Sequence, residues 1–325
     1  MSALPDYKGK RVVVTGGAGF IGSHLVDGLL AAGAERVAVV DNFFLGKDEN
    51  LADARRDGGE RVEIYREDAA EATAMAAVVE TEKPDVVFNL ATKALLYSFF
   101  NPAGACKVNL DIAIALGELL RAGAYGKLIH VSTSEVYGTA AYVPMDEQHP
   151  QLAETSYAAG KAAADSLLVS YVNMFDLDIT ILRPFNNYGP RQNDGALAAI
   201  IPLTIKRIRD GQPPIIQGDG LQTRDFIYVA DTVRGFLEFG ERRSNRGEIY
   251  NLASGIETSV KDIVDTLARL LDYKDDYDWQ PERKADVRRH RADVAKAEAL
   301  IGPIARTELA EGLTSTLDWY LANKP

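Results

Sequence analysis

Short, continuous apolar runs alternate with longer segments of helical period through the first half of the chain. The runs that predict strands are Arg11–Thr15, Arg36–Asp41, Val62–Arg66, Asp85–Leu90, Leu128–Ser132 and Ile179–Arg183. The segments that predict helices are Phe20–Ala32, Ala69–Glu82, Ala103–Ala122 and Ser156–Phe175. Strands that are buried on both faces have continuous apolar runs, and β–α alternation favours parallel pairing. The pattern therefore predicts an α/β fold with a doubly wound parallel sheet.

The pattern changes after Pro184, where Pro and Gly separate shorter elements. Strands are predicted at Pro214–Gln217, Phe226–Val229 and Ile249–Leu252. Helices are predicted at Leu197–Arg209, Asp231–Phe239, Val260–Leu271 and Thr307–Leu321. We expect a first domain in residues 1–183 and a smaller C-terminal region in residues 184–325, parts of which can weave back into the first sheet.

Composition narrows the classes of function. The net charge of −11 and the lack of a basic run argue against nucleic acid as a partner. The single cysteine, Cys106, permits no internal disulfide, and no stretch reaches the ~20 apolar residues of a membrane span. We therefore expect a cytoplasmic protein without a membrane partner. The four histidines show no ligand spacing, so no metal site is predicted.

A glycine-rich turn joins the first predicted strand to the first predicted helix. Gly16 permits a tight turn, Gly19 lets the backbone approach a pyrophosphate, and Gly22 lets helix and strand pack closely. The helix amino terminus then faces the phosphates. Asp41 ends the second strand, where a carboxylate binds ribose hydroxyls and repels a 2′-phosphate. The sequence therefore predicts a Rossmann-type site for NAD rather than NADP.

A second motif supplies candidate chemistry. Tyr157 and Lys161 are four residues apart in a predicted helix and so share one face. Thr133 lies at the end of the fifth strand, the edge of an open α/β sheet where ligands bind. A phenol of ordinary pKa, ~10, is a poor base at neutral pH, and a neighbouring ammonium favours the phenolate. These three residues predict a centre that oxidises a carbinol.

Together these motifs resemble the extended short-chain dehydrogenase/reductase superfamily, in its NAD-dependent epimerase/dehydratase branch. The segments that carry the resemblance are TGGAGFIGSHL (15–25), DNF (41–43), REDAAE around Asp68, FNLA (88–91), STSEVYG (132–138), YAAGK (157–161), RPFNNYGPRQ (183–192), GDGLQTRDFIYVAD (218–231) and DVRRHRADVAKA (286–297). The resemblance implies an NAD-binding Rossmann domain followed by a nucleotide-sugar-binding region.

The resemblance also implies site residues. Besides the residues already named, the cofactor is expected to contact Phe20, Ile21, Asn42, Asp68, Leu90, Ala91 and Asn187. The nucleotide-sugar is expected to contact Lys93, Ser134, Asn186, Arg191, Arg224 and Arg289. Guanidinium groups bind a diphosphate bidentately and supply the positive field that an acidic protein needs. Lys93 binds a carboxylate or a phosphate, or else faces water.

Glu135 bears on which reaction follows oxidation at C4 of the sugar. If the strand continues past Thr133, the two side chains face the same way and a carboxylate reaches the C5 proton. In the resembling family, Glu at this position is typical of 4,6-dehydratases and UDP-glucuronate decarboxylases, and 4-epimerases carry a small residue. Glu154 would repel a glucuronate. The sequence thus favours an NDP-hexose 4,6-dehydratase, with an NDP-sugar epimerase second and a decarboxylase third.

A non-catalytic NAD-binding scaffold is the alternative from a different class. Such a protein can keep the glycine turn while losing its reactive side chains, whereas Thr133, Tyr157 and Lys161 are all present here. In the resembling family, helices equivalent to Ala103–Ala122 and Ser156–Phe175 form a homodimeric four-helix bundle. We therefore expect a homodimeric enzyme.

Overall fold

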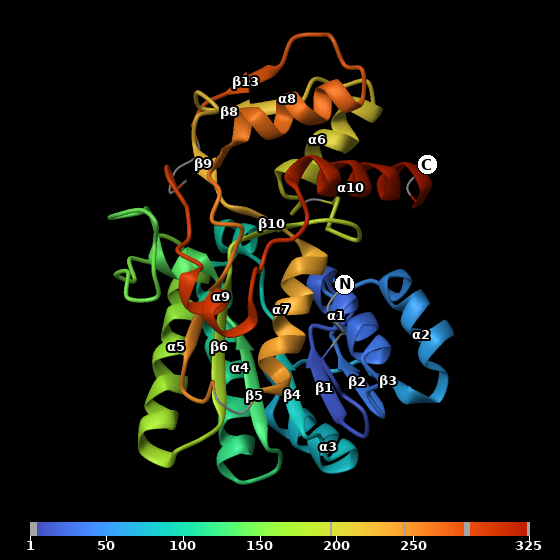
Figure 1. The fold of residues 1–325 in the computed structure, drawn as a ribbon, viewed down its shortest axis with the longest axis vertical. Helices are drawn as coiled ribbons and strands as arrows, with labels where there is room; N and C mark the ends of the chain where they lie inside the picture. Colours follow the sequence, from blue (N-terminus) through green and yellow to red (C-terminus); the bar gives the residue numbers. More distant parts are fainter. Residues whose placement is uncertain (1–4, 196, 243–244, 283–286, 324–325) are drawn as a thin grey trace.

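A parallel sheet forms the centre of the molecule (Figure 1). The computed structural model describes residues 5–195, 197–242, 245–282 and 287–323. Within these residues the sheet has seven strands in the order β11-β6-β5-β4-β1-β2-β3, all paired in parallel. They are β1 (Arg11–Thr15), β2 (Arg36–Val40), β3 (Val62–Tyr65), β4 (Val86–Asn89), β5 (Lys127–Val131), β6 (Ile179–Pro184) and β11 (Ile249–Leu252). The predicted doubly wound α/β fold is confirmed.

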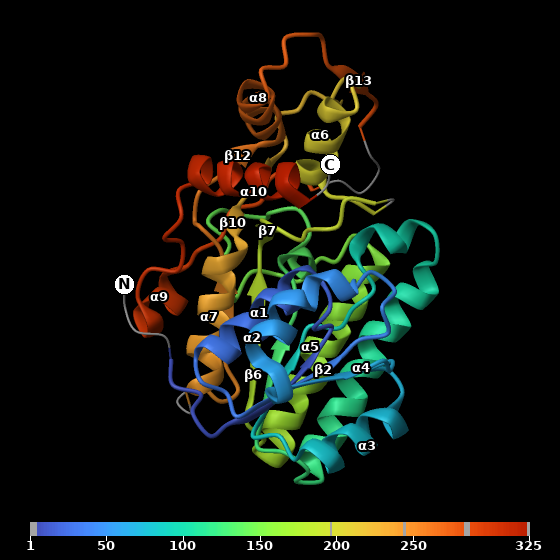
Figure 2. The ribbon, with the colours of Figure 1, turned by 90° about the vertical axis from the view of Figure 1, so that its right-hand side faces the viewer.

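Helices cover both faces of this sheet (Figure 2). One face carries α1 (Phe20–Ala31), α2 (Ala52–Gly58), α7 (Val229–Glu241) and α9 (Ala295–Ile301). The other carries α3 (Ala72–Glu82), α4 (Pro102–Arg121) and α5 (Ser156–Phe175). Each layer encloses its own apolar core, which explains the apolar runs in the middle of the strands.

A smaller lobe stands beyond the carboxyl ends of the strands (Figure 1). Its helices are α6 (Ile200–Arg209), α8 (Val260–Leu270) and α10 (Leu309–Asn323), which pack around Ile201, Leu267 and Leu313. Its short strands pair as β7 (Asn186–Tyr188) with β10 (Phe226–Tyr228), β8 (Ile215–Gln217) with β13 (Asp278–Gln280), and β9 (Thr223–Arg224) with β12 (Thr258–Ser259).

The C-terminal half also returns to the first sheet. Strand β11 pairs with β6, and α7 packs against α1. The Tyr7 hydroxyl at the start of the chain donates to the Leu237 carbonyl at 3.0 Å. Residues 184–325 therefore complete the sheet besides building the lobe, and the boundary near residue 184 stays a prediction.

Short elements add the detail that the apolar pattern does not predict. Helix α2 and helix α9 have seven residues each. Single 3₁₀ turns occur at η1 (Asp48–Leu51), η2 (Gly59–Arg61), η3 (Leu95–Phe99) and η4 (Ser134–Tyr137). The last two matter most, because they lie in the segments that follow β4 and β5 and line the cavity at the end of the sheet.

Candidate active site

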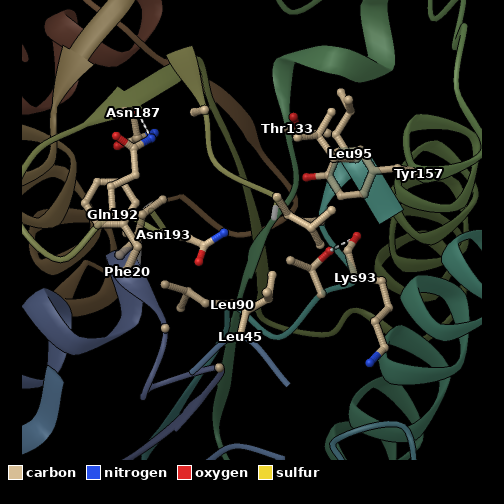
Figure 3. A pocket seen from close by; sticks show the side chains of 18 of the residues that line it. Phe20, Leu45, Leu90, Lys93, Leu95, Thr133, Tyr157, Asn187, Gln192 and Asn193 are labelled. Carbon is tan, nitrogen blue, oxygen red and sulfur yellow. Dashed lines mark hydrogen bonds between the residues drawn. The ribbon is translucent and has the colours of Figure 1, made fainter. Parts of the chain in front are cut away.

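A cavity of about 640 Å³ lies between the carboxyl ends of the strands and the lobe. Its floor comes from the residues that follow β1, β4 and β5, and its roof from α6 and the lobe strands. Figure 3 shows Phe20, Asn187 and Gln192 on one side of this space and Thr133 and Tyr157 on the other. The same cavity thus joins the glycine turn to the predicted reaction centre.

The glycine turn has the close contacts that its sequence predicts. Gly16 has a φ of +70°, and a Cβ there would lie 2.7 Å from the Ala91 nitrogen. A Cβ on Gly22 would lie 2.1 Å from the Gly16 carbonyl oxygen. Only glycine fits these positions, because any side chain would collide with backbone. The turn opens at Gly19 into α1, whose first residues line the cavity. The first N–H groups of a helix have no partner within the helix, which suits an anion.

Asp41 follows β2 at the edge of the same cavity. Its carboxylate accepts backbone hydrogen bonds from Ala18 at 3.0 Å and Phe43 at 2.8 Å. Burial raises the pKa of Asp41, and these two hydrogen bonds oppose the rise. The bonds tie the glycine turn to the loop after β2, and each oxygen keeps a further lone pair for a ribose hydroxyl.

The remaining predicted cofactor residues also border the cavity. They are Phe20, Ile21, Asn42, Asp68, Leu90, Ala91 and Asn187. The Asn42 amide donates to Asp68 at 2.8 Å, which fixes both groups at the rim. The Asn187 amide bonds internally to Phe185 and Thr232. Their contacts with a cofactor stay predictions.

Tyr157, Thr133 and Lys161 meet at the end of the cavity, where Figure 3 shows Thr133 beside Tyr157. Helix α5 presents Tyr157 and Lys161 on one face, and the Thr155 side chain caps its amino terminus by accepting from the Ala158 nitrogen at 3.2 Å. The Lys161 ammonium donates to the Val131 carbonyl at 2.8 Å. The predicted clustering of a phenol, a hydroxyl and an ammonium is thus present.

Burial dominates the titration of this centre. It raises the pKa of Tyr157 to about 12, the hydrogen-bonded Thr133 hydroxyl lowers it, and the charge of Glu135 raises it. Burial also lowers the pKa of Lys161 to about 8, against the charge of Asp165. Deprotonation of Tyr157 to the phenolate that the chemistry needs is therefore unfavourable in the protein without a bound cofactor. A positive charge beside the phenol, such as a nicotinamide ring, would lower that cost.

Glu135 reaches the cavity by a different path from the one expected. The chain does not stay extended after Thr133 but turns into η4, with Thr133 as its N-cap. The Thr133 hydroxyl accepts from the Glu135 nitrogen at 3.2 Å. The alternation argument for Glu135 was wrong for this reason, although Glu135 and Ser134 both line the cavity.

The predicted substrate residues separate into two groups. Asn186 and Arg224 line the lobe side of the cavity, and Asn186 Nδ2 is buried without a hydrogen-bond partner among the described residues. Arg191 also borders the cavity, but its guanidinium pairs with Asp27 at 2.6 Å and Asp53 at 2.7 Å. Arg289 pairs with Glu257 through two hydrogen bonds and is absent from the described cavity lining.

Lys93 and its neighbours form an unusual wall. The Lys93 ammonium lies 3.6 Å from the centre of the Phe44 ring, a cation–π contact, and Figure 3 shows it directed away from Tyr157. Ala94, Leu95 and Leu96 then line the cavity. We call these three residues the apolar wall. The wall offers no hydrogen-bonding side chain to a sugar.

Glu154 lies elsewhere than the sequence argument assumed. Its carboxylate accepts from the Thr139 nitrogen at 2.8 Å, and Glu154 is exposed and absent from the described cavity lining. Repulsion of a substrate carboxylate by Glu154 therefore has no support in the geometry.

Two residues that hold the centre were not predicted. The Thr92 side chain lowers the pKa of Tyr157, and the Ser98 hydroxyl accepts from the Tyr157 nitrogen at 2.9 Å. Thr92 follows β4 closely, so its place at a strand end was a usable signal. Ser98 lies in the η3 turn, whose path the sequence pattern does not define.

A metal centre finds no support in the described ranges, where no group of three or more His, Cys, Asp or Glu side chains could hold an ion. No helix of the described chain is long and apolar enough to cross a bilayer. A dinucleotide-type glycine turn whose cavity ends at a Tyr/Lys/Thr centre defines a dehydrogenase/reductase of the short-chain class. The chain belongs to the extended branch of that superfamily, in the family described as GDP-mannose 4,6 dehydratase, whose model matches residues 13–316.

Relatives in this family have different activities. UDP-glucose 4-epimerase of Mycolicibacterium smegmatis is 34% identical, with 95% of this chain and 98% of the relative covered. UDP-glucuronic acid decarboxylase 2 of Arabidopsis thaliana is 32% identical, with 94% of this chain and 67% of the relative covered. These relatives support an enzyme that modifies nucleotide-sugars.

Solved structures agree with this assignment. UDP-glucose 4-epimerase of Thermotoga maritima, solved with UDP-glucose, has a TM-score of 0.90 at 32% identity, covering 97% of this chain and 99% of that one. dTDP-glucose 4,6-dehydratase of Streptomyces venezuelae, solved with NAD, has a TM-score of 0.89 at 30% identity, covering 97% and 98%.

Proposed function

We propose that this protein is an NAD-dependent nucleotide-sugar 4-epimerase. The observation that carries the proposal is the contact of Tyr157 with Thr133 beside Lys161, at the end of a cavity that begins at the glycine turn. The first relatives named above are 4-epimerases. The sequence alone favours a 4,6-dehydratase because of Glu135. The proposal therefore ranks the epimerase first and the dehydratase second.

The glycine turn fits the cofactor, because Gly16 and Gly22 hold it in a tight fold that only glycine allows, and the turn lines the cavity. Asp41, Asn42 and Asp68 would hold its adenosine end, and Lys161 its nicotinamide ribose. NAD supplies a hydride acceptor that can return the hydride to the sugar. Tyr157 accepts the proton of the C4 hydroxyl, and Thr133 holds that hydroxyl by a hydrogen bond.

Inversion at C4 requires the ketone to present its other face to the same fixed hydride donor. The sugar must therefore turn over inside the cavity between the two steps. The apolar wall favours this movement, since Ala94, Leu95 and Leu96 offer no hydrogen bonds that would anchor one orientation. Asn186 and Arg224 would hold the nucleotide diphosphate while the sugar moves.

A 4,6-dehydratase is the second candidate, because Glu135 lines the cavity and its charge acts on Tyr157. A carboxylate there can take the C5 proton of a 4-keto sugar. The homodimer and the cytoplasmic location stay predictions.

Proton NMR of the products from UDP-, dTDP- and GDP-hexoses tests the proposal. We expect inversion at C4 with the C6 hydroxymethyl group intact. A 4-keto-6-deoxy product would establish the dehydratase instead. With UDP-glucuronate as a further substrate, a product with two protons at C5 in place of the carboxylate would establish a decarboxylase. Tight NAD binding without turnover of any nucleotide-sugar would instead support a non-catalytic NAD-binding scaffold.

A further inference from the structure

A row of buried polar side chains crosses the sheet directly below the reaction centre. Each side chain is at most 1% exposed and comes from a different strand or helix. The row consists of Thr15 (β1), Asn89 (β4), His130 (β5), Asp165 (α5), Arg183 (β6), Tyr137 (η4) and Asn251 (β11). We call it the buried polar row. Burial of this many polar groups is costly unless they satisfy one another.

Hydrogen-bond directions along the row fix the protonation of His130. The Thr15 hydroxyl donates to Asn89 Oδ1 at 2.8 Å, so the Asn89 amide nitrogen is the group that faces His130 Nδ1 at 3.0 Å. Nδ1 must therefore accept, and the proton of neutral His130 lies on Nε2, which is 3.7 Å from Asp165 Oδ1. Burial lowers the pKa of His130 well below its ordinary value, which agrees with a neutral ring.

Asp165 is the carboxylate at the middle of the row. Arg183 donates to Asp165 Oδ2 through Nε at 3.0 Å and pairs with it through Nη2 at 2.9 Å. The other end of Arg183 donates to the Tyr137 hydroxyl at 2.9 Å, which donates to Asn251 at 2.7 Å. Burial raises the pKa of Asp165 and Arg183 opposes this. A guanidinium keeps its proton in proteins, so its partner is the ionised carboxylate.

Asp165 lies one helical turn after Lys161, on the same face of α5. Lys161 is 3% exposed and buried among the elements that pack on α5. The elements that pack on α5 carry several charged or titratable side chains. They are His130 from β5, Arg183 from β6, Glu135 and Tyr137 from η4, and Tyr97 from η3, besides Tyr157 and Asp165 of α5 itself. The charged groups of α4 pair with one another, as Lys107 with Asp111 and Glu118 with Arg121.

We propose that Asp165 is a positioning residue for the reaction centre. Held in place by Arg183, it supplies the negative charge that keeps the Lys161 ammonium protonated beside Tyr157. Without that charge, Lys161 would be a buried cation with no carboxylate of its helix face to offset its burial. It would then release its proton near neutral pH. The inference rests on the proposed role of the Tyr157 centre, and its test is independent of turnover.

Direct titration of Lys161 tests the inference. In protein labelled with ¹³C at lysine Cε, the Lys161 signal is assigned by its loss in K161M and followed from pH 6 to pH 11. We expect a midpoint near the value of about 8 in the parent protein. In D165N the midpoint falls by about 1 pH unit or more, the usual effect of one nearby opposite charge. D165E keeps the charge, and its midpoint stays close to that of the parent.

Removal of one partner can leave Arg183 as a lone buried charge and prevent folding. The double variant D165N/R183M removes both charges, so it folds without that penalty. Its midpoint also falls, but by less than in D165N, because loss of the Arg183 cation offsets part of the effect. E82Q is the matched control, since Glu82 is 2% exposed and pairs with Arg11 and Arg36 away from Lys161. It leaves the Lys161 midpoint unchanged.

An unmoved Lys161 midpoint in folded D165N or in the double variant would overturn the inference, as would a fall of equal size in E82Q or D165E. A moved midpoint in a protein that turns over no nucleotide-sugar would instead remove the proposed function and leave the charge relation intact. The alkaline limb of kcat against pH provides a second readout, which moves with the midpoint in active variants.

Discussion

Tyr157 stands at the centre of the chemistry at the scale of single residues. Its phenol contacts the hydroxyls of Thr133 and Thr92, and its backbone is held by Ser98. Such a fixed phenol is pre-positioned as a base, because binding need not order it. Burial opposes this role as a base, because it raises the pKa of Tyr157 to about 12.

Replacement of Tyr157 by Phe keeps the ring and removes the proton acceptor. We expect kcat to fall by roughly 10²–10⁴-fold, the usual contribution of a positioned acid or base, with little change in melting temperature. Steady-state kinetics and thermal melts measure the two effects. Y142F is the control, because Tyr142 is exposed outside the described cavity lining and its hydroxyl donates to Asp146 at 2.8 Å. Equal losses in Y157F and Y142F would contradict the role of Tyr157.

Glu135 affects the same phenol through its charge, which raises the pKa of Tyr157. In E135Q this contribution is lost, so the phenolate forms at lower pH. The acid limb of kcat/KM against pH should therefore move to lower pH. E154Q removes a carboxylate of the same type from outside the described cavity lining and should leave the limb in place. Loss of all product with retained formation of reduced nicotinamide in E135Q would instead favour dehydration.

At the scale of elements, the turns after β1, β4 and β5 build the site. The strand and helix positions follow from apolar periodicity, because burial on both faces leaves a continuous pattern in the sequence. The glycine turn is also readable, since Gly16 and Gly22 have no room for a Cβ. The 3₁₀ turns η3 and η4 cannot be predicted from the sequence. A single turn is too short to show a periodic pattern, and its conformation is set by packing.

The same limit explains which site residues could be predicted. Tyr157, Lys161 and Thr133 lie on or beside regular elements, so spacing places them together. The partners of Arg191 and Arg289 are distant in sequence, Asp27 and Asp53 for one and Glu257 for the other. Spacing carries no information on such pairs, and a resemblance names a residue without giving the direction of its side chain.

The glycine turn allows a test with a matched pair of substitutions. In G16A the new Cβ meets the backbone of Ala91 and Leu90 at 2.7 and 2.8 Å, so the turn must move. In G123A the φ is also positive, at +75°, but nothing lies within 4 Å. Both should lower the melting temperature, since a left-handed Ala costs about 1–2 kcal/mol.

Only G16A should also lose the rise in melting temperature that NAD gives by binding the folded state. Differential scanning fluorimetry with and without NAD separates the two effects. Retention of the full NAD-dependent rise in G16A would show that this turn is not the cofactor site.

At the scale of the whole molecule, the two halves of the chain share one core and one cavity. Lys47, in the loop after β2, pairs with Asp194 of the C-terminal half at 3.0 Å. Asn186 and Arg224 line the same cavity as Tyr157 and Thr133, so both halves of the chain contribute to its wall. Binding of a substrate that contacts both halves would therefore show that the two halves are folded together.

A fragment of residues 1–183 tests whether the first half is an independent domain. The fragment lacks β11 and α7, whose Val233, Phe236, Leu237 and Phe239 are buried in the core that α1 shares. Burial of each such side chain contributes about 1.5–3 kcal/mol, and their sum rivals the net stability of a typical domain, about 5–15 kcal/mol. Their loss also exposes the apolar face of α1 and leaves β6 as an open edge.

We therefore expect the fragment to aggregate or to melt without cooperativity, whereas the full chain melts cooperatively. Circular dichroism melts and size-exclusion chromatography of both proteins measure this. A cooperative melt of the fragment, raised by NAD, would instead establish residues 1–183 as a domain that folds alone. In that case α7 and β11 would be additions to a complete sheet, because the remaining strands and helices would already bury enough apolar surface to offset the entropy of folding.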